Sequence, residues 1–140
     1  MDIPYLSDVT PETLPKFESA LRGLATDLID PFRIRTNTLD KALFGQKPVG
    51  YGAISQSGTR ELIGAALYSP LISTAIGHPG AYVSDLWVAE LARGQKVGRT
   101  LLRYVARRSD QMWDARFLRL TVYDANKPAS SGDNFELFGI

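Results

Sequence analysis

Apolar residues in the first quarter of the chain recur at the spacing of a helix face. Between residues 7 and 30 they fall three or four positions apart, at Leu14, Phe17, Leu21, Leu24 and Leu28. This period predicts an amphipathic helix. Thr10 is a suitable N-cap with Pro11 at the first helical position, and Pro31 ends the pattern.

Two further segments have helical character. Residues 37–45 predict a short helix that Asn37 or Thr38 caps and Gly45 closes. A longer helix is predicted after the glycine-containing loop near residue 95. Its apolar side comprises Leu101, Leu102, Val105, Met112 and Trp113. A second side carries a repeat of basic residues, Arg99, Arg103 and Arg107, which is typical of a solvated helix face.

Other segments have the composition of strands. Residues 3–6 predict a short edge strand, because Pro4 cannot lie in a central one. Residues 49–69 predict a hairpin around a Ser-Gly turn, and residues 70–80 predict a loop. Residues 81–88 are rich in β-branched and aromatic side chains and predict a further strand.

The order of these elements predicts the fold class. After the last helix, residues 116–124 predict a strand, and the remaining tail has an irregular pattern. The strand–helix–strand unit over residues 81–123 favours parallel pairing through a crossover, whereas the hairpin favours antiparallel pairing. We therefore expect a single α/β (α+β) domain over residues 1–140, with a mixed sheet flanked by helices.

Composition narrows the possible functions. The 140 residues suit one domain, and 44% hydrophobic with 22% charged residues indicates a globular chain. A net charge of +1 argues against a nucleic-acid binder. The absence of cysteine excludes a thiolate metal site and a cysteine nucleophile, and a single histidine, His78, excludes a histidine-rich metal site. No secretory signal or membrane-spanning run is present, so a cytoplasmic location is expected.

The segment VAELARGQKVGRTLL, residues 88–102, concentrates glycines and basic side chains where a strand gives way to a helix. A helix N-terminus offers unpaired N–H groups to anions, and glycines let the backbone come close to them. Local spacing leaves two interpretations open, a basic connector or a pyrophosphate cradle. The spacing is neither that of a P-loop nor that of a Rossmann fingerprint.

This segment resembles the acetyl-coenzyme A motif of the Gcn5-related N-acetyltransferase (GNAT) superfamily, Arg/Gln-x-x-Gly-x-Gly/Ala between a strand and a helix. The matching positions are Val88, Arg93, Gly94, Val97, Gly98, Leu101 and Leu102. Lys96 occupies the central glycine position. The tail matches in outline at Asn126, Ala129, Glu136 and Gly139. Phe135 aligns with a tyrosine that serves many members as general acid, and the chain ends at Ile140, where the family continues into two more strands.

The resemblance implies a GNAT-like, mostly antiparallel sheet and an acetyl-CoA-dependent N-acetyltransferase that transfers acetyl directly to an amine. It implies that acetyl-CoA is held by backbone or side-chain groups of Leu86, Trp87, Val88, Arg93, Gly94, Gln95, Lys96, Val97, Gly98, Arg99, Thr100 and Asn126. Candidate catalytic residues are Asp85 and Glu90 as bases, and the proton donor to the thiolate is Tyr123, Tyr82 or solvent.

Three features leave other outcomes open. Lys96, Phe135 and the early C-terminus favour a non-catalytic CoA-binding or regulatory protein on the same fold as the alternative. If strands are missing, a second copy of the chain would cover the exposed sheet edge, so a homodimer is expected. We expect an amine acceptor and no metal, nucleic-acid or membrane partner.

Overall fold

The computed structural model describes residues 4–122 and 133–137. Within these residues six strands form one sheet in the order β1-β2-β3-β4-β5-β6. The elements, in chain order, are β1 (Tyr5–Asp8), α1 (Leu14–Leu28), α2 (Thr36–Phe44), β2 (Tyr51–Gln56), β3 (Leu62–Ser73), β4 (His78–Val88), the 3-10 turn η1 (Glu90–Ala92), α3 (Val97–Trp113), β5 (Leu118–Val122) and β6 (Asp133–Leu137).

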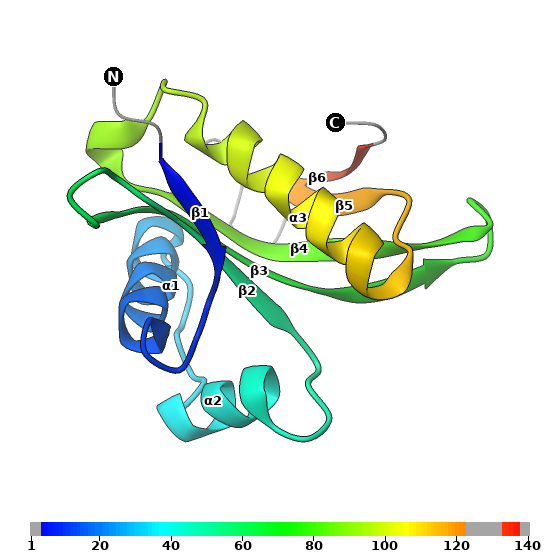
Figure 1. Cartoon of the computed structure of the whole chain (residues 1–140), viewed down its shortest axis with the longest axis horizontal. Coiled ribbons are helices and arrows are strands. Elements are labelled where there is room, and N and C mark those ends of the chain that lie inside the picture. The colour runs from blue at the N-terminus through cyan, green and yellow to red at the C-terminus, as the bar shows by residue number, and fades with distance from the viewer. Residues whose placement is uncertain (1–3, 123–132, 138–140) are drawn as a thin grey trace.

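Strand pairing confirms the predicted mixed, mostly antiparallel sheet. Each neighbouring pair from β1 to β4 is antiparallel, and so is β5–β6. β4 and β5 are parallel, because α3 carries the chain back along the sheet between them. Helices α1 and α2 cover one face of the sheet and α3 covers the other (Figure 1).

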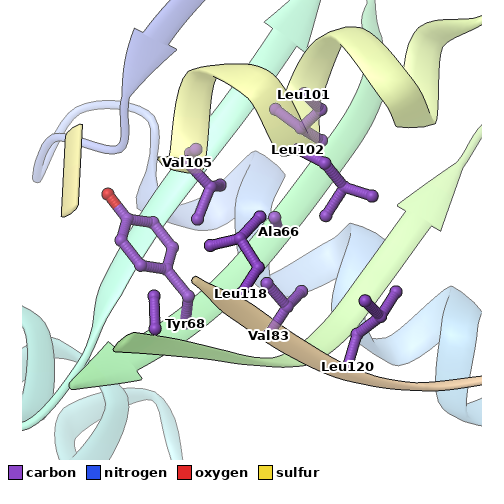
Figure 2. Close-up of a cluster of buried hydrophobic side chains, with 10 residues drawn as sticks. Ala66, Tyr68, Val83, Leu101, Leu102, Val105, Leu118 and Leu120 are labelled. Atoms are coloured by element: carbon purple, nitrogen blue, oxygen red, sulfur yellow. The ribbon is translucent and has the colours of Figure 1, made fainter. Parts of the chain in front are cut away.

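Each face of the sheet therefore has its own apolar core. On the α3 face, Leu101 and Val105 are fully buried against Val83, Leu118 and Tyr68 of the strands (Figure 2). On the other face, Phe17, Leu21 and Leu39 of α1 and α2 pack against Ile54 and Ala65. The predicted apolar stripes of the first and third helices are the faces that these helices bury, since packing follows the 3.6-residue period.

The start of α1 differs from the prediction. The helix begins at Leu14 rather than at Pro11, and residues 11–13 form turns. The N-cap is Thr13 rather than the predicted Thr10, and no side chain caps the helix. In the turn before the helix, the Thr10 hydroxyl accepts a hydrogen bond from the Thr13 N–H at 3.3 Å. The Thr13 hydroxyl in turn accepts one from the Thr10 N–H at 2.8 Å. Two reciprocal threonines therefore hold this first turn.

The predicted N-cap of α2 is wrong, whereas its C-cap is confirmed. The helix begins at Thr36, so Asn37 and Thr38 lie inside its first turn, and Arg35 is the N-cap without a side-chain cap. The Thr36 hydroxyl instead donates to Glu18 of α1 at 2.8 Å. Gly45 closes the helix as predicted, in an extended conformation.

Two segments expected to be irregular are paired. Residues 70–80 are not a loop, because β3 and β4 continue through them as a hairpin that closes at Ser73 and His78. Gly77, with φ of +83°, makes the turn, and the prolines at 70 and 79 gave the misleading loop signal. The tail contains β6, which pairs with β5 from Leu118 opposite Leu137 to Val122 opposite Asp133.

Candidate active site

The sheet opens between β4 and β5. Their parallel pairing ends at Val83 opposite Leu120, although β4 continues to Val88. On the other side of β4, pairing with β3 continues as far as Val88 opposite Gly64. Residues 84–88 thus carry one edge that pairs with β3 and a second edge that no described strand covers.

A β-bulge at Ser84 lies at the point where the two strands part. Leu67 pairs with Asp85 and Tyr68 with Val83, so Ser84 is the additional residue. A bulge reverses the alternation of side chains. Val83 accordingly packs in the α3 core, whereas Asp85 faces a pocket below α1. Without the bulge, Asp85 would lie on the same face as Val83.

Backbone directions along this edge follow from one hydrogen bond. The Ala89 N–H donates to the Ile63 carbonyl at 2.9 Å, toward β3. Because successive residues of a strand point their N–H and C=O groups to opposite sides, Val88 and Leu86 direct theirs to the open edge. Trp87 lies between them and turns its backbone toward β3, while its side chain packs against the α1 core.

The loop after β4 leads directly into α3. Gly94 has φ of +82° and Lys96 has φ of +63°. Lys96 therefore holds the left-handed conformation that glycine adopts without strain, which accounts for a glycine at this position of the family motif. No side chain caps α3, and its first turn contains no acidic residue. The N–H groups and partial positive charge of that turn are thus available to an anion.

The sequence predicts that backbone N–H groups from Gln95 to Thr100 bind the anion. In the structure, fewer of these N–H groups are free to do so. The Thr100 N–H already donates to the Lys96 carbonyl at 3.0 Å, as does its hydroxyl at 2.9 Å. The N–H groups of residues 97–99, at the start of the helix, have no such acceptor within α3. A Cβ added to Gly98 would lie 3.7 Å from Val88 and 3.9 Å from Leu86. The helix start therefore packs against the side chains of Val88 and Leu86 at the end of β4.

Arg93 connects this loop with two other elements. Its Nε donates to the Val88 carbonyl at 3.3 Å, from the open side of β4. Its Nη2 lies 3.5 Å from a carboxylate oxygen of Asp27 in α1. Sequence reasoning did not identify Asp27. Arg93, Lys96 and Arg99 are all exposed, so the loop presents three positive side chains around the helix start.

Asp85 has an unusual environment for a carboxylate. Burial raises its pKa, the nearby Asp30 carboxylate raises it further, and a 2.9 Å hydrogen bond from the Ser84 hydroxyl only partly opposes this. Asp85 lines a pocket of about 260 Å³ together with residues of α1 and of the segment that follows it. A carboxylate with a raised pKa at the point where the sheet opens is suited to accept a proton.

The other predicted catalytic residues lie on separate elements. Glu90 is exposed at the start of η1. The Tyr82 hydroxyl lies 3.2 Å from the Thr121 hydroxyl and joins β4 to β5 just before they part. Tyr123 and Asn126 lie outside the described residues. Asp30 was missed, although its position at the end of the first helical pattern, just before Pro31, was a possible signal.

In the part of the chain that the structure describes, histidines, aspartates and glutamates form no group of three or more that could hold a metal ion. None of the helices in this part of the chain combines the length and the apolar character needed to cross a membrane.

Comparison with known proteins places these features in context. The model of the acetyltransferase (GNAT) family matches residues 12–131. No curated protein sequence matches the chain. A ribosomal-protein-alanine N-acetyltransferase from Brucella melitensis biovar Abortus 2308 has a similar structure, with a TM-score of 0.68 at 15% identity, over 91% of this chain and 87% of that chain.

Two further solved structures share the fold. An aminoglycoside acetyltransferase from an uncultured soil metagenomic sample, in complex with sisomicin, gives a TM-score of 0.68 at 18% identity, over 91% of this chain and 82% of that chain. NAA60 of Arabidopsis thaliana, in complex with acetyl-CoA, gives 0.62 at 18% identity, over 91% of this chain and 80% of that chain. At such low identity these likenesses show the fold alone.

Proposed function

The chain belongs to the acetyltransferase (GNAT) family, and from this premise we propose that it is an acetyl-CoA-dependent N-acetyltransferase that transfers acetyl directly to an amine. One observation carries the proposal. The open edge of β4, residues 84–88, leads to the uncapped start of α3, so backbone donors for an extended chain and for an anion adjoin one another. The absence of cysteine excludes transfer through a thiol on the enzyme.

The residues present fit a phosphate-bearing ligand with an amide-containing arm. N–H groups of residues 97–99 would hold the pyrophosphate, aided by the charges of Arg93, Lys96 and Arg99. Leu86 and Val88 would pair with amides of the arm, as an added strand does. Bound acetyl-CoA would supply the acetyl group as a thioester. The Val88 N–H would polarise its carbonyl.

Asp85 is the proposed base, because its raised pKa and its position at the β4 bulge suit proton acceptance from an amine. Glu90 remains a second candidate, acting through water. Tyr123 is the proposed proton donor to the departing thiolate, and Asn126 the proposed contact to the arm of acetyl-CoA. Trp87 is not assigned a donor to acetyl-CoA, because its backbone pairs with β3 and its side chain packs against the α1 core.

Acetyl-CoA binding can be tested at a single N–H. Arg99 is exposed at the third position of α3, where proline is compatible with the helix. Arg99→Pro removes both the charge and the N–H, while Arg99→Ala removes the charge alone. Calorimetric titration should show acetyl-CoA binding to Arg99→Pro about tenfold weaker than to Arg99→Ala, as expected for loss of a hydrogen bond to an anion. Equal affinities would contradict the assignment of this N–H.

Turnover separates the two functional hypotheses. Free-thiol release from acetyl-CoA should depend on an added amine when the wild-type protein is tested against an amine panel. Binding of acetyl-CoA without thiol release on any amine would instead support the non-catalytic alternative. No binding at micromolar concentrations would contradict both.

A homodimer remains our proposal for the assembly. β1 and β6 are the outer strands of the sheet, and strand edges of this kind pair readily. Light scattering should give twice the monomer mass, and a monomer at all concentrations would contradict the proposal.

A further inference from the structure

A pocket below the C-terminal end of α1 meets the sheet where β4 and β5 part. It has a volume of about 260 Å³ and lies between α1, residues 30–34 and the strands β3 and β4. Asp85, which lines it, follows the last β4–β5 pair by two positions. The pocket is on the α1 face of the sheet and α3 is on the other, so two molecules could approach the open edge from opposite faces.

The walls of this pocket are mainly apolar. They are formed by Leu21, Leu24, Leu28, Phe32, Ile34 and Leu67. Phe32 makes a cation–π contact with Arg22, whose guanidinium carbon lies 4.5 Å from the ring centroid. The volume is below that of a site for a drug-sized ligand, so the pocket suits a compact apolar body.

Three charged side chains line the pocket, and they differ in exposure. Asp85 is half-buried, whereas Asp30 and Arg33 are exposed at the rim. The formal charges of Asp30 and Arg33 cancel, so one carboxylate, Asp85, remains to compensate a cation inside the pocket. A second ammonium on the same ligand would reach a rim whose formal charge is zero, so it would lose hydration without a net counter-charge, which disfavours it.

We infer that this pocket selects a primary amine with a compact apolar body and a single positive charge, and discriminates against polycationic amines. The inference rests on the proposed function, with the pocket as the acceptor side of the same reaction. In that reaction the amine nitrogen bonds to the acetyl carbon while the carbon–sulfur bond breaks. Asp85 takes one proton from the bound ammonium so that the free amine can attack, and the nitrogen releases its second proton to solvent. The departing thiolate takes a proton from Tyr123, which solvent then reprotonates.

Competing amines test the selectivity. The kcat/KM for benzylamine and isoamylamine should exceed that for spermidine in the wild-type protein. Arg33→Gln should raise the spermidine-to-benzylamine ratio of kcat/KM about fivefold, because it removes a like charge at the rim. Asp30→Asn should lower that ratio by a similar factor. Arg35→Gln and Asp40→Asn, which change exposed neighbours outside the pocket, should leave it unchanged.

A binding measurement keeps this inference distinct from the proposed function. Benzylamine and spermidine are titrated calorimetrically into the protein saturated with coenzyme A, so the preference is read without turnover. Tighter binding of benzylamine, with a preference that Arg33→Gln shifts toward spermidine, supports the pocket assignment even if thiol release fails and the enzyme proposal falls. A preference for spermidine, no binding of either amine, or equal responses of Arg33→Gln and Arg35→Gln would overturn it.

Discussion

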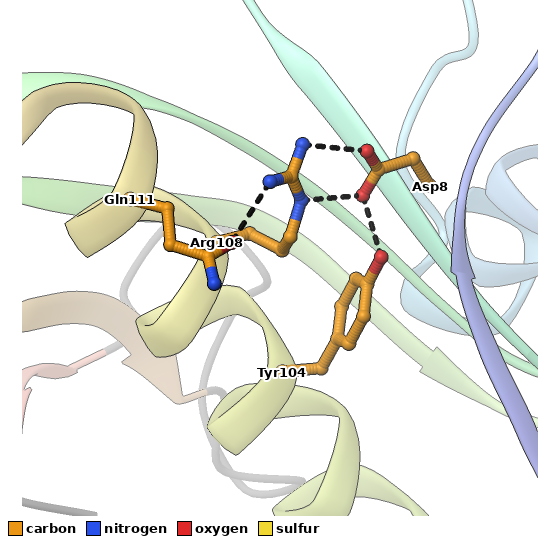
Figure 3. A network of polar contacts seen from close by, with 4 residues as sticks. All are labelled: Asp8, Tyr104, Arg108 and Gln111. Atoms are coloured by element: carbon orange, nitrogen blue, oxygen red, sulfur yellow. Dashed lines mark hydrogen bonds and ion pairs between the residues drawn. The ribbon is translucent and has the colours of Figure 1, made fainter.

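Asp8 and Asp85 are two partly buried aspartates on strands of the same sheet, and their surroundings have opposite effects. Asp8 ends β1 and accepts hydrogen bonds from the Tyr104 hydroxyl at 2.6 Å and from Arg108 Nε and Nη2 at 3.0 and 2.8 Å (Figure 3). Asp85 accepts one from the Ser84 hydroxyl, and the charge of another carboxylate, Asp30, raises its pKa. Asp8 thus has three hydrogen bonds and a cationic partner, whereas Asp85 has one neutral donor.

The pKa of each group shows the same contrast. Burial would raise the pKa of Asp8, but hydrogen bonds from Arg108 and Tyr104 and the charge of Arg108 outweigh it and lower the pKa. At Asp85 burial dominates and the pKa is raised. Ionised Asp8 therefore stabilises the folded state, and ionised Asp85 destabilises it. Functional sites commonly retain such unfavourable groups.

The largest expected effect is on catalysis. Asp85→Asn should lower kcat by about 10²- to 10⁴-fold, the range for loss of a general base. The Kd for acetyl-CoA should change little, because the proposed contacts to acetyl-CoA come from backbone groups of β4 and α3, whereas the Asp85 side chain faces the pocket on the α1 face. Asp8→Asn should keep the wild-type kcat when it is measured at a temperature below the midpoint of its thermal unfolding. Steady-state kinetics with benzylamine and titration with acetyl-CoA measure both quantities. Equal losses of kcat in the two variants would remove the distinction.

Stability should show the opposite ranking. Asp8→Asn should lower the free energy of unfolding by about 1 to 2 kcal/mol, since it weakens charge-assisted hydrogen bonds, and partial exposure of the pair limits the loss. The Asp8 side chain is 44% exposed and that of Arg108 is 29% exposed. Asp85→Asn should cause no loss or a small gain. Urea unfolding of both variants at neutral pH measures this, and a destabilised Asp85→Asn would contradict the assigned roles.

The pH dependence of stability should also have opposite signs at the two residues. The lowered pKa means that the Asp8 contribution is present above its unfolded pKa and is lost as pH falls through the folded pKa. The raised pKa of Asp85 gives a destabilising contribution that is present at neutral pH and disappears as pH falls toward the unfolded value. Urea unfolding of wild type and both variants across this acid range should show the two differences shrinking from opposite sides. If the free energy of unfolding of a variant ran parallel to that of the wild type across this pH range, the sign assigned to that aspartate would be wrong.

The contrast between these aspartates also marks how far the sequence can be interpreted. The helical period around Phe17 and the motif from Arg93 to Gly98 are local patterns, so they predicted α1 and the loop before α3. The face on which Asp85 lies depends on the bulge at Ser84, which β-strand alternation alone does not reveal. The pairing of Asp8 with Arg108, one hundred positions apart, depends on packing of β1 beside α3.

The smallest expected effects concern two tyrosines near Asp8. The Tyr104 hydroxyl donates to Asp8, and burial together with this bond raises the Tyr104 pKa to about 12. Tyr68 is 1% exposed, and its hydroxyl has no partner among the described residues. Tyr104→Phe should therefore lower the free energy of unfolding by about 1 kcal/mol, the usual net value of a hydrogen bond.

Tyr68→Phe removes the same atom from the same residue type, but it relieves a buried hydroxyl that has lost water without gaining a partner. The variant should keep or slightly raise the free energy of unfolding, by up to about 1 kcal/mol. Chemical denaturation of the two variants in parallel compares them directly, with the ring packing unchanged in each. A loss at Tyr68 as large as that at Tyr104 would mean that a bridging water links Tyr68 to the Asp8 network. The contrast drawn between Asp8 and Asp85 would then not extend to these two tyrosines.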